Sequence, residues 1–275
     1  MKVWTADEIR EASQVNSPEE IEREYTEFAP GQGFIVIRNV FKNFEMFREV
    51  IRSCPFYPNT LSKLNPFYTN VAPDALLKNV KEVICTPKWN NLVSSYGNYY
   101  TNDLIDCTKV QSYPHSDSFT DQPKVLVGNI WLSEHNPKNQ TCFYYNKKTG
   151  KHNWTGQEYF DAAPAWRERV DQKFRNFVED DFLVKVGAAP TETGTISVYF
   201  SDIIHAPHVD YDDPNPRHSY VLMFGDQSYM NRMGGMMGPM GAMPGNEPGK
   251  MGPFGKKKGG FPHMSELTMI GRKGI

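Results

Sequence analysis

The sequence lacks the features that mark secreted, membrane-spanning and nucleic-acid-binding chains. The segment from Met1 to Glu8 contains no apolar core of a signal peptide. No stretch approaches the roughly 18 consecutive apolar residues of a membrane span. The formal net charge of −2 gives no general attraction to nucleic acid or to acidic membranes. We therefore expect a cytoplasmic protein with no membrane partner, and we do not expect nucleic acid as a partner.

Cysteine is scarce and widely spaced. The four cysteines contain no C-x-x-C pair, and they are Cys54, Cys85, Cys107 and Cys142. This spacing does not fit a zinc site or the disulfide framework of a small secreted domain. We expect reduced cysteines in the interior of the protein.

The composition is that of a folded chain, and helix signals come first. Of the 275 residues, 39% are hydrophobic and 23% are charged. Thr5 to Glu8 resembles a capping box, and Ser17 to Glu20 repeats that chemistry, so we predict helices between residues 5 and 28. After them we predict a strand over Phe34–Phe41, helices over Phe44–Cys54 and Leu76–Ile84, and an irregular loop over the proline-rich residues 55–73.

Strand signals dominate after residue 105. The β-rich runs are Ile105–Tyr113, Lys124–Ser133, Thr141–Tyr145, Thr195–Phe200 and Ser219–Phe224. A charged segment with helical periodicity, residues 156–182, interrupts them. Helices followed by closely spaced strands predict an α+β domain with a barrel or sandwich core.

The sequence divides into three predicted regions. Residues 1–33 form an N-terminal helical extension, and residues 34–224 form one β-rich domain with a helical insert at about 146–186. Ten of the twelve methionines lie from Met223 onward, mixed with glycine and proline, so we expect residues 225–275 to be an extended low-complexity tail. Because methionine is an adaptable contact residue, the tail is also a candidate docking segment for a protein partner.

The H-x-D pair His115–Asp117 is the strongest chemical signal. It follows a predicted strand, in which residues i and i+2 project from the same face. One imidazole and one carboxylate are two of the three ligands in the 2-His-1-carboxylate triad of non-haem iron enzymes. The third ligand would be a downstream histidine, either His205 or His208. The simpler interpretation is a solvated histidine beside a turn aspartate.

An ordered set of motifs resembles the 2-oxoglutarate/Fe(II)-dependent dioxygenase superfamily, and within it the prolyl-4-hydroxylase-like branch and its small phage and bacterial members. The motifs are His115-Ser-Asp117, the strand Val125–Ser133, Thr141-Cys-Phe143, Phe200-Ser-Asp-Ile-Ile-His205 and Arg217-His-Ser219. The resemblance covers roughly residues 34–224. It implies a double-stranded β-helix fold, which is a jelly-roll or cupin-like fold.

The resemblance also implies a ligand set. His115, Asp117 and a downstream histidine would bind Fe(II). The motif around Phe200 favours His205 over His208, although the spacing to Arg217 does not choose between them. Arg217 would pair with the distal carboxylate of 2-oxoglutarate as a bidentate fork. Ser219, on the same strand face, and Tyr113 would be further co-substrate contacts, and O₂ would be the second co-substrate.

The function implied is hydroxylation of an unidentified substrate, with a peptidyl or amino-acid side chain suggested by the branch. Fold-level analogy says little about substrate. The alternative is a structural or virion-assembly protein built on the same fold, with the tail as a docking arm and a virion location if the gene belongs to a phage. A cupin-like metal enzyme without 2-oxoglutarate would be expected to show more histidine ligands and to have no need of Arg217.

Overall fold

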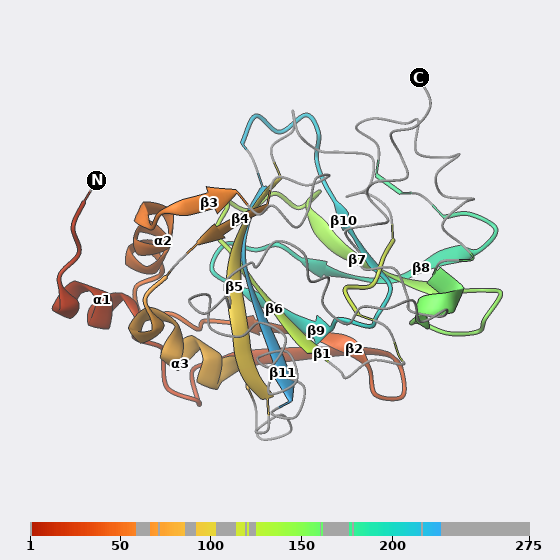
Figure 1. Ribbon diagram of the computed structural model, residues 1–275, viewed down its shortest axis with the longest axis horizontal. Coiled ribbons are helices and arrows are strands. Elements are labelled where there is room, and N and C mark those ends of the chain that lie inside the picture. The colour runs from red at the N-terminus through yellow and green to blue at the C-terminus, as the bar shows by residue number, and fades with distance from the viewer. Residues whose placement is uncertain are drawn as a thin grey trace, which may run out of the picture.

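The computed structural model describes residues 2–58, 67–70, 72–85, 92–102, 114–118, 120, 125–159, 161, 176–177, 179–215 and 217–226. Two antiparallel sheets form the body of the molecule (Figure 1). In sheet order, the larger sheet contains β1 (Glu22–Ala29), β2 (Gln32–Arg38), β9 (Ile196–Phe200), β6 (Val125–Trp131), β11 (Arg217–Asp226), β5 (Leu92–Asn102), β4 (Phe67–Asn70) and β3 (Phe56–Pro58). The smaller sheet contains β10 (His205–His208), β7 (Gln140–Asn146) and β8 (Leu183–Pro190).

The chain passes repeatedly between the two sheets. After β6 in the larger sheet it forms β7 and β8 in the smaller one, returns for β9, crosses again for β10 and ends with β11 in the larger sheet. Every strand pair is antiparallel. This alternation is the winding of a jelly roll, or double-stranded β-helix. The predicted fold class is confirmed.

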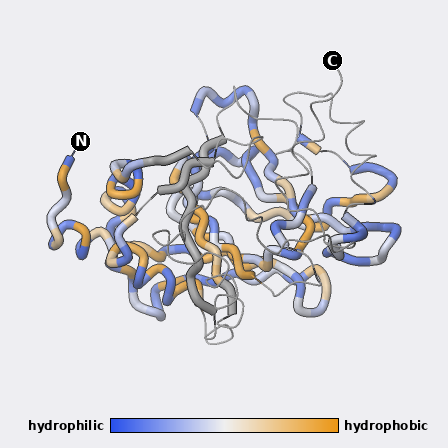
Figure 2. The backbone as a smooth tube through the Cα atoms, in the orientation of Figure 1, coloured by the Kyte–Doolittle hydropathy of each residue, from blue (hydrophilic) through white to orange (hydrophobic). Residues whose placement is uncertain are grey.

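Three helices lie together on one side of the larger sheet (Figure 1): α1 (Ala6–Ala12), α2 (Phe44–Ser53) and α3 (Asp74–Ile84). Hydrophobic and hydrophilic stretches alternate along them (Figure 2). The buried side of α2 carries Phe47, Val50 and Ile51, spaced for one helix face. These side chains join the largest apolar cluster, which also contains Leu126 and Leu222 of the sheet. The helices therefore cover the outer face of the larger sheet.

The inner face of the larger sheet meets the smaller sheet. A second apolar cluster joins Val127 and Tyr199 of the larger sheet to Phe143 and Ala189 of the smaller one. Phe143 lies flat against Phe34, with ring centroids 4.8 Å apart. The strands alternate between the two clusters, because successive side chains of a strand point to opposite faces.

Most predicted elements are found, with one clear error. The capping box at Thr5 is present and begins α1. The helical prediction is wrong for residues 22–29, because these form strand β1 in a hairpin with β2. The Ser17 signal produces only one turn, in which the amides of Glu20 and Ile21 donate to the Ser17 carbonyl. Pairing with β2 outweighs the local helical preference.

The structure also adds strands that the sequence pattern did not predict. Residues 55–73 contain β3 and β4, so that segment is not wholly irregular. Strands β5, β8 and β10 had no predicted counterpart. The predicted strand Ile105–Tyr113, residues 162–175 of the predicted insert and the tail from residue 227 lie outside the described residues.

Among the described cysteines, Cys142 is buried, and Cys54 and Cys85 are partly buried, so the expected interior position holds fully for Cys142 only. None of these three forms a disulfide, and Cys107 lies outside the described residues. Burial raises the pKa of the Cys142 thiol. In the part of the chain that the structure describes, no helix is long and apolar enough to cross a membrane.

Candidate metal centre

The H-x-D segment pairs with the strand that carries the downstream histidine. The amide of His115 donates to the carbonyl of His205, and the amide of His205 donates back, each at 2.8 Å. Two residues on, the amide of Asp117 donates to the carbonyl of Ser201 at 2.8 Å. The segment thus lies beside β10 at the edge of the smaller sheet, and it brings side chains nearly ninety residues apart in sequence together.

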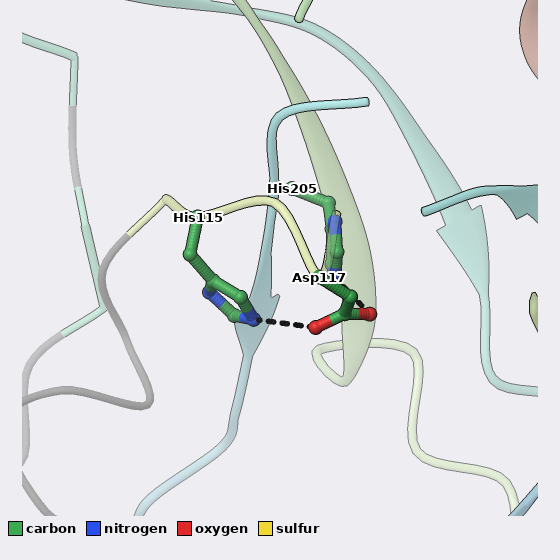
Figure 3. Close-up of side chains that lie close together, drawn as sticks. All are labelled: His115, Asp117 and His205. Atoms are coloured by element: carbon green, nitrogen blue, oxygen red, sulfur yellow. Dashed lines mark ion pairs between the residues drawn. The ribbon is translucent and has the colours of Figure 1, made fainter. Parts of the chain in front are cut away.

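Two imidazoles and one carboxylate converge there (Figure 3). His115 Nε2 lies 3.7 Å from one oxygen of Asp117, and His205 Nε2 lies 3.5 Å from the other. The ligand atoms of all three residues lie within 4.8 Å of one another. Among the described residues this is the one such group of three potential metal ligands. Cis ligands of one ion at about 2.1 Å lie about 3 Å apart, so a small inward movement would let all three bind a single metal.

The surroundings of His205 fix the orientation of its imidazole and keep the ring neutral. The ring is buried, and its Nδ1 lies 2.9 Å from the carbonyl oxygen of Ile203, to which it can donate. That hydrogen bond leaves the lone pair of Nε2 directed towards Asp117. Burial lowers the pKa of His205 to about 4, against the opposing attraction of Asp117. The imidazole is therefore neutral at physiological pH, which is the form that binds a metal.

Arg217 and Ser219 both lie on the inner face of the larger sheet and are buried. The guanidinium of Arg217 lies over the ring of Trp131, with Cζ 4.4 Å from the ring centroid. Its Nη2 donates to the hydroxyl of Thr141, in the neighbouring sheet, at 3.3 Å. The predicted anchor is thus a buried cation held between an aromatic face and a hydroxyl. Tyr113 lies outside the described residues.

The inner wall carries further polar side chains that sequence reasoning missed. The indole of Trp131 donates to Ser197 at 3.0 Å, and the Asn129 amide donates to the Tyr199 hydroxyl at 3.1 Å. Tyr199 also packs against His205, with ring centroids 4.9 Å apart. Burial, and then the charge of Asp117, raise the pKa of the Tyr199 phenol. The sequence signal that could have identified these residues was Asn129, a polar residue two positions from Trp131 in an apolar strand.

The second choice for the third ligand, His208, is not part of the cluster. It lies three positions after His205 in β10, so its side chain leaves the opposite face of the strand. His208 is half-buried, and its pKa is lowered by burial and then by the charges of Lys185 and Arg217. The structure therefore brings His205, and not His208, together with the H-x-D pair.

Comparison with known proteins gives a likeness of overall shape only. No family model matches the chain, and no curated protein matches it. A solved structure of the non-haem alpha-ketoglutarate-dependent carbocyclase SnoK, from nogalamycin biosynthesis, is 13% identical with a TM-score of 0.47, over 72% of this chain and 82% of that one. HygX from Streptomyces hygroscopicus, with nickel and 2-oxoglutarate bound, is 16% identical with a TM-score of 0.40, over 71% and 84%. An N-substituted L-amino acid dioxygenase from Burkholderia ambifaria is 12% identical with a TM-score of 0.37, over 69% and 81%. At these values the likeness carries no inference about ligand or reaction.

Proposed function

We propose that the protein is an Fe(II)- and 2-oxoglutarate-dependent oxygenase that hydroxylates its substrate. The observation that carries the proposal is the convergence of His115, Asp117 and His205 within 4.8 Å. Two imidazoles and one carboxylate on one side of an ion leave its other positions open, which is the arrangement used by non-haem iron oxygenases. Zinc enzymes also use two histidines and a carboxylate. The assignment of iron therefore depends on the proposed binding site for the co-substrate 2-oxoglutarate.

The protein's own contribution is to hold three ligands and to prepare them for binding. The Ile203 carbonyl fixes the orientation of the His205 ring, and burial keeps that ring neutral. Asp117 faces both imidazoles, so its negative charge offsets part of the charge of a bound cation. Bound iron would supply, with 2-oxoglutarate and O₂, the oxidation of an unactivated C–H bond.

Arg217 is the proposed anchor for the distal carboxylate of 2-oxoglutarate. The guanidinium is buried, lies over the ring of Trp131 and donates to the hydroxyl of Thr141. A carboxylate would pair with it bidentately. Ser219 and Tyr113 are proposed as further contacts to the same co-substrate, with Tyr113 resting on the motif resemblance alone.

A peptidyl or amino-acid side chain is the proposed substrate class, and it rests on the prolyl-4-hydroxylase-like motifs. A protein partner for the tail beyond residue 226 remains a proposal of the same kind. The alternative function is a structural or assembly protein that retains the fold without using the cluster. Metal and 2-oxoglutarate binding discriminate between the two.

The test is an anaerobic titration of the purified protein with Fe(II) and then 2-oxoglutarate. We expect the weak visible charge-transfer absorption of an iron–2-oxoglutarate complex. His115→Ala and His205→Ala should abolish it, and Arg217→Ala should weaken it. His208→Ala, on the same strand as His205, is the matched control and should leave it unchanged. Release of succinate in the presence of O₂ would then report turnover.

The opposite results are equally informative. Absence of the absorption in the wild-type protein would favour the structural alternative. Loss of the absorption in His208→Ala and its retention in His205→Ala would mean that the third ligand is misassigned. Iron binding without any effect of 2-oxoglutarate would indicate a metal site with different chemistry.

A further inference from the structure

Two buried serines alternate with the metal-ligand candidates in the H-x-D segment. Ser116 and Ser118 are almost fully buried, at 3% and 7% exposure, although Asp117 between them is exposed. The Ser116 hydroxyl donates to the backbone carbonyl of Asp202 at 2.9 Å. The hydroxyls of Ser118 and Ser201 share a short hydrogen bond. The serines therefore attach the segment to the Ser201–Asp202 turn, which leads directly into His205.

Backbone contacts tie the same two segments together. The amides of Asp117 and Ser118 both donate to the carbonyl of Ser201, at 2.8 and 3.2 Å. Because one carbonyl accepts both, the turn sets the position of the Asp117 backbone directly. The side chain of Asp117 is 28% exposed, so packing fixes its direction only in part. The hydrogen bonds of the neighbouring backbone and serines fix the point from which the carboxylate projects.

A third segment, residues 152–154, braces both halves of the centre from outside. The amide of Ile204 donates to the carbonyl of His152, and the amide of Thr120 donates to the carbonyl of Trp154, at 2.8 and 2.9 Å. The side-chain amide of Asn153 donates to the buried carboxylate of Asp202 at 3.3 Å. His152 in this segment is buried against Phe28 and Tyr145.

We propose that Ser116, Ser118 and Asn153 are positioning residues of the metal centre. They hold the H-x-D segment against the Ser201–Asp202 turn, so that the Asp117 carboxylate meets both imidazoles before a metal arrives. This inference rests on the proposed metal-binding function. Ser201 and Asp202 belong to the Phe200–His205 motif but are not candidate metal ligands. The inference gives them a role, which is to hold the H-x-D segment. Removing these hydrogen bonds should loosen the three-ligand set while the fold remains intact.

The test is a Co(II) titration of the full chain, because Co(II) reports its coordination through its visible spectrum. The variants are Ser116→Ala, Ser118→Ala and Asn153→Ala, with the melting temperature recorded for each. Ser13→Ala is the matched control. Ser13 is similarly buried, at 4% exposure, and its hydroxyl donates to the backbone carbonyl of Arg10 at 2.8 Å. It lies at the C-terminal end of α1, in the helical layer.

We expect Ser116→Ala and Ser118→Ala to bind Co(II) roughly 10-fold more weakly and with an altered spectrum, as for other groups that support metal ligands. Asn153→Ala should have a smaller effect in the same direction. Ser13→Ala should bind Co(II) like the wild type at a comparable loss of melting temperature. Wild-type affinity and spectrum in both serine variants, with binding still abolished by His115→Ala, would overturn the inference and leave the metal site standing. No Co(II) binding by the wild type would overturn both.

Discussion

The two faces of the larger sheet are built from the same strands and have opposite characters. Alternate residues of β6, β9 and β11 point to the helices on the outer face, and these are Leu126, Ile130, Ile196, Val198, Tyr220, Leu222 and Phe224. The residues between them point to the smaller sheet, and the polar ones are Asn129, Ser197, Arg217 and Ser219, with the amphipathic Trp131 and Tyr199. The outer face is nearly all apolar, and the inner face combines apolar and polar groups.

The outer face therefore mainly stabilises the fold, and the inner face carries the polar groups that could bind a ligand. Apolar burial on the outer face stabilises the fold at roughly 25 cal/mol for each Å² removed from water. Buried polar groups on the inner face stabilise it little, and each must find a partner. Buried polar groups, including the Arg217 guanidinium, nevertheless gather on the inner face. We infer that the inner face is shaped for a ligand, and four measurements can break or sharpen this contrast.

The largest expected effect belongs to the outer face. Leu222→Ala removes a fully buried side chain from the cluster beneath the helices, which should lower the free energy of unfolding by about 2–5 kcal/mol. Ser219→Ala, three positions earlier on the inner face, should lower it by less than about 1.5 kcal/mol. Urea unfolding of both variants measures the contrast. Equal losses would show that the two faces do not divide in this way.

The second effect is a pH dependence of the free energy of unfolding of the metal-free protein, and it originates at His205. The pKa of His205 is about 4 when folded and about 6.5 when unfolded, so the unfolded state binds more protons between those values. Stability is therefore complete above pH 6.5 and falls by up to about 3 kcal/mol as the pH decreases towards 4.

Urea unfolding at several pH values, with a metal chelator present, measures this slope. His205→Gln should flatten it, and the difference between the two proteins separates His205 from the other histidines. An unchanged slope in His205→Gln would mean that other groups cause the acid sensitivity.

The third effect concerns the anchor. Arg217→Lys keeps the positive charge but loses the planar fork, so 2-oxoglutarate should bind the iron-loaded protein roughly 10-fold more weakly, or by about 1.4 kcal/mol. The control is His218→Ala, at the next position of β11 and on the other face. Titration of 2-oxoglutarate measures both. Wild-type affinity in Arg217→Lys and in Arg217→Met would remove Arg217 from the site.

The smallest effect tests the fit of the helices on the outer face. A Cβ at Gly128 would lie 2.9 Å from Cδ1 of Ile84 on α3, which is the end of a flexible side chain. Gly128→Ala should therefore cost about 1 kcal/mol of stability. Ile84→Val removes that methyl group, so Gly128→Ala should cost less in its background, and the double-mutant cycle should be non-additive. Co(II) affinity should not change in either variant.

Several parts of the centre could be predicted from the sequence, because they depend on local patterns. The H-x-D pair and the strand alternation of Arg217 and Ser219 are short-range features. The motif around Phe200 favoured His205 over His208, and the register of β10 against β7, which pairs His205 with Phe143, places His205 on the inner face. A shift of one residue would have exchanged the faces of the strand. The role of Ser116 and Ser118 could not be predicted, because the sequence around a serine does not indicate the hydrogen-bond partner of its hydroxyl.

The sequence by itself determined the H-x-D pair, the positions of the three described helices and those of five of the eleven described strands. Periodicity and capping act within a few residues, so they can be read directly from the order of amino acids. Only the tertiary structure decided that residues 22–29 form strand β1, that His205 joins His115 and Asp117, and that the Ser201–Asp202 turn holds the segment. These features depend on pairing between distant segments, where the gain from backbone hydrogen bonds and burial outweighs local preference.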